Sequence, residues 1–127
     1  MAGRGPAEQQ PRGLTHLRVT FSDTFYVGPG RADLLEGIAA TGSIAAAGKA
    51  MGMSYKRAWS LVQALNEGFG RPLVETSRGG AEQGGASLTA DGAFVLERYR
   101  AMQDAARKAM AGDVAAVIRR LVLSSRK

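Results

Sequence analysis

The stretch GMSYKRAWSLVQ, residues 52–63, brings cationic, hydroxyl and amide side chains together around the chain's single tryptophan. At helical spacing, one face of this stretch is polar throughout and presents Tyr55, Lys56, Arg57, Ser60 and Gln63. The first acidic residue on that face is Glu67. Such side chains donate hydrogen bonds to phosphates and to base edges in the major groove. The pattern predicts a surface that binds double-stranded DNA, and the alternative is an ordinary solvated helix face beside a core.

The chain offers no set of residues suited to catalysis. It has no cysteine and a single histidine, His16, and no acidic residue pairs with a histidine or with a second acid in a recognisable site. Nucleophilic and general acid–base chemistry therefore lack their usual groups, and so does a cysteine- or histidine-ligated metal site. We predict no catalytic residues, no metal site and no bound cofactor, and we expect that the protein is not an enzyme.

Two helices around a tight turn would position the polar face. Ser43 is predicted to cap the first helix and Ser54 the second, because a serine hydroxyl can accept from the free N–H groups of an opening turn. Gly52 suits the turn between them, since glycine adopts a positive φ without steric cost. Ala47 and Gly48 are small enough to let the helices cross closely. The spacing predicts a helix-turn-helix in which Ser43 and the recognition helix, residues 54–69, contact DNA.

The opposite face of the recognition helix is apolar and is predicted to face the core. Its residues recur at helical spacing: Ala58, Leu61, Val62, Leu65 and Phe69. Trp59 lies on the flank between the two faces. We expect its ring to pack against the first helix or the following hairpin rather than to stack on a base.

Two elements are expected before the helix-turn-helix. Residues 1–13 are rich in glycine, proline and polar residues and are expected to be disordered. Apolar and polar residues alternate from Leu17 to Val27, which predicts a short β-hairpin. The GPG segment at 28–30 interrupts this pattern, and a helix follows whose apolar face ends before a stop at Gly42.

The sequence predicts a second hairpin with a glycine-rich loop over residues 71–89, RPLVETSRGGAEQGGASLT. A hairpin directly after a helix-turn-helix is a wing, here residues 73–89, and Arg78, Gly79 and Gly80 are predicted to contact the DNA backbone or minor groove. The loop lacks the Gly-Lys-Ser/Thr ending of a phosphate-binding P-loop. The remaining alternative is an inert surface loop.

The C-terminal part is predicted to be helical. Thr89 is a candidate N-cap and Asp91 suits the positive end of a helix dipole. The helix is expected to run to about Met110 and to be interrupted at Gly112. A second apolar stripe follows, formed by Val114, Val117, Ile118, Leu121 and Val122. We expect a domain over 14–110 and a C-terminal helical extension over 111–127 that forms a homodimer contact; the alternative is a basic amphipathic helix on a membrane.

Length and charge agree with one small DNA-binding domain. The chain has 127 residues, 45% of them hydrophobic, and a formal net charge of +6 that favours an anionic partner. Many of the cations lie in the last thirty residues, where a basic tail is most often a solvated surface. No apolar run approaches the roughly 18 residues of a membrane span, so we expect a soluble, cytoplasmic protein. The predicted fold is mainly α with small β-hairpins, a winged helix-turn-helix with C-terminal helices for dimerisation.

The chain resembles the amino-terminal DNA-binding domain of the ModE family of molybdate-dependent transcriptional regulators over residues 30–110. The resemblance is carried by the segments GSI and GMSYKRAW and by the wing pattern from GG to LT. The resemblance implies a winged helix of the LysR type that dimerises on a palindromic operator, often at genes for molybdate uptake and molybdenum enzymes. It implies that residues 54–57 begin the recognition helix and that Arg78 and the glycines after it lie on the wing.

Full-length members of that family also carry β-barrel domains that hold molybdate or tungstate. We expect no molybdate-binding domain in this chain, so the resemblance extends to DNA binding alone. The predicted function is a sequence-specific transcriptional regulator that binds a palindromic operator as a homodimer through the recognition helix and the wing. The alternative is a protein-interaction module that forms heterodimers with a full-length regulator and modulates it.

Overall fold

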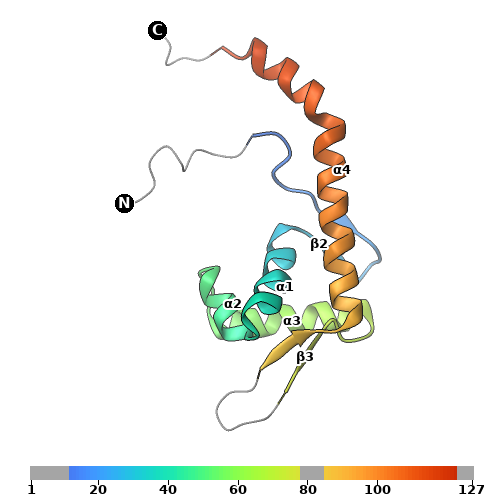
Figure 1. Ribbon diagram of the computed structural model, residues 1–127. Coiled ribbons are helices and arrows are strands. Elements are labelled where there is room, and N and C mark those ends of the chain that lie inside the picture. The colour runs from blue at the N-terminus through green and yellow to red at the C-terminus, as the bar shows by residue number, and fades with distance from the viewer. Residues whose placement is uncertain (1–11, 78–84, 123–127) are drawn as a thin grey trace.

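The computed structural model describes residues 12–77 and 85–122. Within these ranges the chain forms helices and two small antiparallel hairpins, as predicted. The elements are β1 (Val19–Thr20), β2 (Tyr26–Val27), α1 (Pro29–Thr41), α2 (Ile44–Ala50), α3 (Tyr55–Phe69), β3 (Val74–Thr76), β4 (Ala86–Leu88) and α4 (Ala90–Arg120). Figure 1 shows α1, α2 and α3 gathered into one body, with α4 rising from it as a long rod. The fold is a winged helix-turn-helix.

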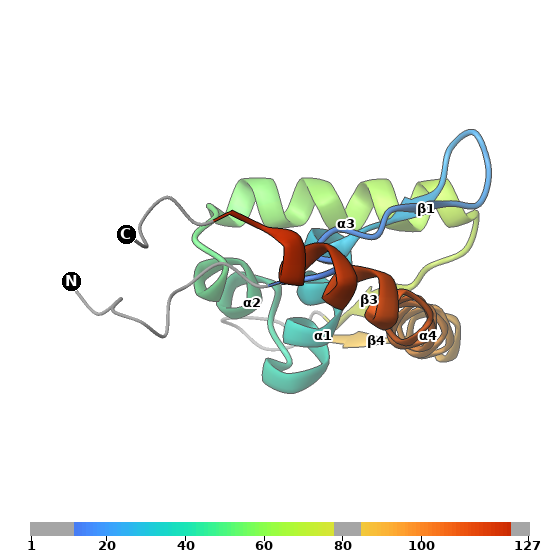
Figure 2. The same ribbon diagram turned by 90° about the horizontal axis from the view of Figure 1, so that it is seen from above.

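The core lies where α1, α3, α4 and the two hairpins meet. Its largest fully buried side chains come from all of these elements: Val27, Leu34, Leu35, Ile38, Val62, Leu65, Leu73 and Tyr99. Burial of one such aliphatic side chain contributes about 1.5–3 kcal/mol. Viewed from above in Figure 2, α3 spans the body between α2 at one end and α4 at the other. The apolar face predicted for the recognition helix is confirmed at Ala58, Val62 and Leu65, which are buried.

The turn between α2 and α3 follows the sequence closely. Ser43 Oγ accepts from the Ala46 N–H at 3.0 Å, and Ser54 Oγ accepts from the Arg57 N–H at 3.1 Å, so both predicted N-caps form. Gly52 has φ +76°, which an L side chain adopts only with strain. A Cβ atom added to Gly48 would lie 2.7 Å from the Cβ of Ala58, so the crossing of the two helices requires glycine there.

The N-terminal hairpin is present but short. Val19 pairs with Val27 and Thr20 with Tyr26. The hydroxyl of the buried Tyr99 donates to the Leu17 carbonyl oxygen at 2.6 Å, which ties the segment before β1 to α4. Helix α1 begins at Pro29, inside the GPG segment, because proline is well suited to the first helical position.

The wing is anchored to the end of α3 by a side chain. Asn66 Oδ1 accepts from the backbone N–H groups of Leu73 and Val74, and its Nδ2 donates to the Val74 carbonyl oxygen. Strands β3 and β4 then pair antiparallel, with Val74 opposite Leu88. The Ala86 N–H donates to the Gly42 carbonyl oxygen at 2.9 Å. The base of the wing is therefore fixed to both α1 and α3.

The expected break at Gly112 is wrong. Helix α4 runs without interruption from Ala90 to Arg120, capped at its start by Thr89 and with Asp91 in its first turn. Glycine weakens an exposed helix by roughly 1 kcal/mol relative to alanine but ends it only where a positive φ is imposed. Gly112 has no positive φ and no neighbour that would need one. The C-terminal extension is thus the far half of α4 rather than a separate helix.

Candidate nucleic-acid interface

The outward side of α3 divides into a centre and two flanks. Lys56, Ser60 and Gln63 lie along the centre, directly opposite the buried Ala58 and Val62, and all three are exposed. Their spacings of three and four residues place them in one row along the helix. A row of donors on a helix of 15 residues has the form that major-groove recognition requires.

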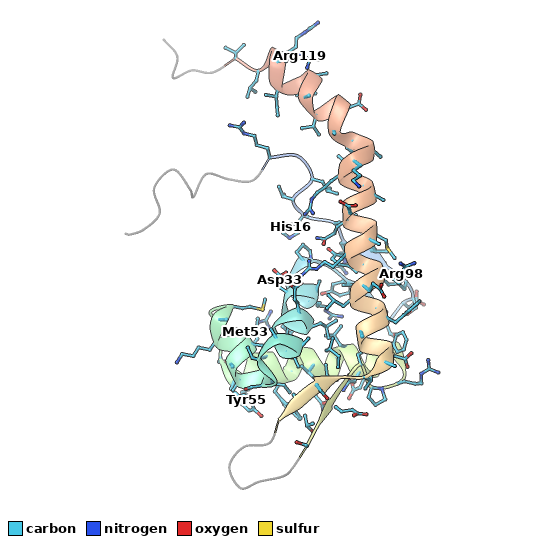
Figure 3. The ribbon with its side chains drawn as sticks, in the orientation of Figure 1. His16, Asp33, Met53, Tyr55, Arg98 and Arg119 are labelled. Atoms are coloured by element: carbon cyan, nitrogen blue, oxygen red, sulfur yellow. The ribbon has the colours of Figure 1, made fainter. Side chains whose placement is uncertain are left out.

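An aromatic pair forms one flank of this row. The rings of Tyr55 and Trp59 are stacked, with centroids 6.5 Å apart and planes 18° apart. Tyr55 is 58% exposed and Trp59 37% exposed. We expected Trp59 to pack on the preceding helix or the wing, but the ring contact found for it is with Tyr55 on its own helix. Figure 3 shows Tyr55 at the lower end of the helix-turn-helix, on the side from which the wing extends.

Arg57 lies on the other flank, away from the aromatic pair. Together with Leu61 it lines a cleft that also contains His16, Arg18 and Arg31. The sequence predicts one polar face that presents Arg57 together with Tyr55 and Lys56, but in the structure Arg57 lies on a different side of α3 from these two residues. Successive residues on a helix turn by about 100°, so adjacent residues do not share a face.

Ser43 and Ser54 act first as helix caps. Each hydroxyl oxygen already accepts a backbone N–H, so its role in the fold is to begin a helix. A hydroxyl that accepts in this way retains its own proton and can still donate. Both residues begin helices at the helix-turn-helix, and Ser54 is exposed.

The region around the turn has no acidic residue. The sequence contains none between Glu36 and Glu67, whereas Lys49, Lys56 and Arg57 are exposed there. Within residues 12–77 and 85–122, these three cations take part in no ion pair. No acidic side chain in the described part of the chain neutralises these three cations, so they can pair with an external anion, most strongly at low salt.

The predicted wing contacts Arg78, Gly79 and Gly80 lie outside the described residues. The described part of the wing ends in a closed base, where the Ser77 N–H donates to the Gly85 carbonyl oxygen at 2.9 Å and the Gly85 N–H donates to Ser77 Oγ at 3.2 Å. This closure brings the two ends of the loop together.

Two sets of residues with a role at or near the interface were not predicted from the sequence. Asn66 orients the wing relative to α3, and its position eight residues before Val74 carries no signal in a single sequence. Arg18 and Arg31 stack on Tyr26 with their guanidinium carbons 3.7 Å and 3.9 Å from the ring centroid. Alternation of apolar and polar residues marked Arg18 as exposed but gave no sign of this partner.

The described residues contain no group of His, Asp and Glu side chains that could hold a metal ion. Burial raises the pKa of Tyr99, whose hydroxyl is held by the Leu17 carbonyl in the core. That tyrosine belongs to the packing of α4 and lies on an element other than the interface helices. No helix of the described residues is long and apolar enough to cross a membrane.

Comparison with known proteins agrees with this geometry. Residues 31–93 match the model of the bacterial regulatory helix-turn-helix protein, lysR family. The chain is 42% identical over 84 residues to the molybdenum-pterin-binding protein MopA of Rhodobacter capsulatus, covering 66% of this chain and 32% of MopA. It is 34% identical over 93 residues to the DNA-binding transcriptional dual regulator ModE of Escherichia coli K12, covering 73% of this chain and 36% of ModE.

A solved structure is similar over the same region. The crystal structure of the CbnR DBD–DNA complex has a TM-score of 0.55 and 27% sequence identity, and the match covers 69% of this chain and 95% of that chain. The present chain spans about a third of the length of MopA and ModE. The similarity therefore concerns a DNA-binding domain and not the rest of those proteins.

Proposed function

The chain carries a LysR-type helix-turn-helix domain at residues 31–93, and from this premise we propose that it is a DNA-binding transcriptional regulator. The observation that carries the proposal is the outward side of α3, where Lys56, Ser60 and Gln63 form one exposed row in a region without acidic residues. Such a row can donate to base edges while neighbouring cations meet phosphates. We propose that the protein binds DNA, and we propose no catalytic role for it.

Within this function, Lys56, Ser60 and Gln63 read bases from the centre of α3. Tyr55 contributes from the aromatic flank, where an exposed ring can contact a thymine methyl group or a sugar. Ser43 and Ser54 contact backbone phosphates at the two helix starts, in addition to capping them. Arg78, Gly79 and Gly80 contact the DNA backbone from the wing. These assignments rest on the exposure of the described residues and on the position of the wing beside α3.

We further propose that the regulator is ModE-like and binds a palindromic operator as a homodimer in the cytoplasm. The far half of α4 and its C-cap residue support a dimer, because they expose apolar side chains at Met110, Val117, Ile118 and Leu121. Val117 is 67% exposed and Leu121 56% exposed. Figure 1 shows this half of α4 extending beyond the body of the domain. Burial of such a stripe against a second copy would remove it from water and set two recognition helices apart by two-fold symmetry.

The first experiment is a fluorescence-anisotropy titration of the purified protein into short labelled duplexes at two salt concentrations. The duplexes are the DNA upstream of its own gene, the DNA upstream of molybdate-transport genes, and scrambled versions of each. We expect one palindromic segment to bind on the order of 1,000-fold more tightly than scrambled DNA. Equal and weak binding to every duplex, abolished by salt, would refute a sequence-specific regulator.

The same titration separates the heterodimer alternative. A module that acts only by joining a full-length regulator would bind each duplex weakly when alone and would gain affinity when that regulator is added. Val117→Glu on α4 tests the homodimer by sedimentation velocity. We expect the wild type to sediment as a dimer and the variant as a monomer, with Ala116→Glu, on an exposed neighbouring position, as the matched control.

A further inference from the structure

A cleft on the α1 side of the recognition helix gathers basic residues from three separate parts of the chain. It has a volume of about 300 Å³. Its basic lining residues are His16, Arg18, Arg31 and Arg57, and no acidic residue is found among the described residues that line it. The backbone from Gly28 to Gly30 completes its wall. We call this site the basic cleft.

The arginines of the basic cleft are held in place by Tyr26. Both guanidinium carbons lie within 4 Å of the ring centroid, at 3.7 Å for Arg18 and 3.9 Å for Arg31. Two guanidinium groups cannot occupy the same position over one ring face, so they occupy opposite faces. Arg31 is fixed further by donation from Nη1 to the Tyr26 carbonyl oxygen at 3.2 Å. Each cation–π contact contributes roughly 0.5–1 kcal/mol and reduces the ordering cost of binding an anion.

No carboxylate of the described residues pairs with these arginines. Among residues 12–77 and 85–122, neither Arg18 nor Arg31 forms an ion pair, and Arg31 Nε is buried without a hydrogen-bond partner. The nearby acids of α1, Asp33 and Glu36, are both engaged by Arg100 of α4. An uncompensated guanidinium at the wall of a cleft favours a bound anion.

The start of α1 adds a second source of positive potential. Helix α1 begins with Gly28 as N-cap, without a side-chain cap and with no acidic residue in its first turn. The N–H groups of a first helical turn have no intrahelical partner and carry the positive end of the helix dipole. Because Gly28, Gly30 and Arg31 all line the basic cleft, this potential acts on the same space as the side chains.

The chemistry of the basic cleft fits a tetrahedral oxyanion better than a nucleobase. Both faces of Tyr26 are already covered by guanidinium groups, so the ring cannot stack on a base. Apart from Pro29 and the apolar side chains of Met53 and Leu61, the remaining lining groups carry N–H donors, which match phosphate oxygens. Figure 3 shows His16 beside the start of α1, at a distance along the body from Tyr55 on the aromatic flank. The basic cleft is thus separate from the face that reads bases.

Arg57 connects the basic cleft to DNA. It stands in the first turn of α3 and also lines the basic cleft, so an anion bound there lies beside the start of the recognition helix. A helix in the major groove, which is about 12 Å wide, has a phosphate strand along each side. We propose that the basic cleft binds a backbone phosphate of the DNA strand that passes the α1 side of α3. This inference rests on the proposed function.

The matched test compares Arg18→Gln with Arg98→Gln, which removes the same charge from α4. The dependence of the binding constant on salt is measured for the operator and for scrambled DNA. We expect Arg18→Gln to weaken binding to both duplexes by roughly tenfold and to make the slope of log K against log salt shallower by about one unit. Arg18→Lys should retain most of the affinity, and melting temperatures show whether each variant is folded.

Two results of this test would overturn the proposal. One is that folded Arg18→Gln has the same affinity and salt slope as Arg98→Gln. The other is a loss confined to the operator, since a phosphate contact weakens binding to every sequence alike.

A second measurement identifies the source of the oxyanion. Amide resonances of Gly30 and Arg31 are followed by NMR during titration with inorganic phosphate and, separately, with duplex DNA. Movement with DNA, absent in Arg18→Gln, supports the backbone phosphate. Saturable movement with inorganic phosphate alone would show an oxyanion site that does not serve DNA, and would overturn the assignment to the backbone. No movement with either would overturn the site itself.

The duplex titrations and the NMR titrations together distinguish a failure of the phosphate site from a failure of the proposed function. A wild-type protein that binds no duplex with preference fails as a regulator, whatever its cleft does with inorganic phosphate. A wild-type protein that binds its operator tightly while Gly30 and Arg31 stay unmoved retains the proposed function and loses only the basic cleft.

Discussion

The cations of α4 and those around the helix-turn-helix occupy two surfaces that differ in their acidic neighbours. On α4, Arg100 pairs with Asp33 and Glu36 at 2.9 Å and at 2.6 Å, and Lys108 pairs with Asp104 at 3.1 Å. Around the turn, Lys49, Lys56 and Arg57 lie in a stretch with no acid at all. A net charge of +6 is therefore a poor guide to the site, because the distribution of the acids decides which cations are available.

The two surfaces also differ in what their charges do for the fold. The Arg100 guanidinium joins α4 to α1 and donates to the buried Gln103 at 3.0 Å. The Arg107 Nε donates to the Leu14 carbonyl oxygen at 3.3 Å. Around the turn, the α2–α3 crossing depends on small residues, and the cations contribute nothing to it. The charges of Arg100 and Arg107 on α4 serve packing, while no described acid pairs with Lys49, Lys56 or Arg57 beside the turn.

The largest expected effect comes from breaking the crossing that holds one of the two surfaces together. Gly48→Val places a branched side chain where even a Cβ atom would lie 2.7 Å from that of Ala58. We expect a loss of about 3 kcal/mol or more in the free energy of unfolding, measured by chemical denaturation. Gly30→Val, at a position where an added Cβ has no neighbour within 4 Å, is the control for the substitution itself. Equal stability of the two variants would contradict the close crossing.

The two surfaces can be compared directly with two double variants, each of which removes two cations from one surface. The variant Lys56→Ala/Arg57→Ala should lose roughly 100-fold in affinity for operator DNA at moderate salt, because it removes one central donor and one flank contact. The variant Arg98→Ala/Lys108→Ala has the same net charge and should stay within about twofold of the wild type. Anisotropy titrations measure both. Equal losses would mean that net charge alone drives binding.

The converse experiment removes the ion pairs between α4 and α1. Arg100→Ala leaves Asp33, Glu36 and Gln103 without their shared donor, and we expect it to lower the free energy of unfolding by about 1–2 kcal/mol. Because the pairs are partly exposed, the difference from wild type should shrink at high salt. Operator affinity of the folded variant should be unchanged. A tenfold loss of affinity without a loss of stability would assign Arg100 to the DNA surface instead.

The smallest expected effect concerns the continuity of α4. Gly112→Ala should raise stability by about 0.5–1 kcal/mol, because Gly112 lies inside the helix, without a positive φ and with free space around it. Thermal and chemical denaturation measure the change. Gly52→Ala is the matched opposite, and it should destabilise by roughly 1–2 kcal/mol because φ there is +76°. A destabilising Gly112→Ala would restore the break that the sequence predicted.

Local signals predicted most of the helix-turn-helix correctly. Ser43, Ser54 and Thr89 cap helices as expected, and Gly42 and Gly52 take positive φ. These predictions succeeded because a cap or a turn depends on groups within a few residues of each other. Gly112 misled the same reasoning, since a glycine in a sequence carries no sign of the φ value that its surroundings impose.

The sequence by itself determined the helix starts at Ser43, Ser54 and Thr89, the turn at Gly52 and the buried face of α3. It also determined that no acidic residue lies between Glu36 and Glu67. The tertiary structure alone decided that His16, Arg18, Arg31 and Arg57 line one cleft, and that Asp33 and Glu36 are turned to Arg100. The physical reason is the difference in sequence separation over which these interactions act. Periodicity and capping act over one or two turns of a helix, whereas the compensation of charge depends on which distant segments are packed together.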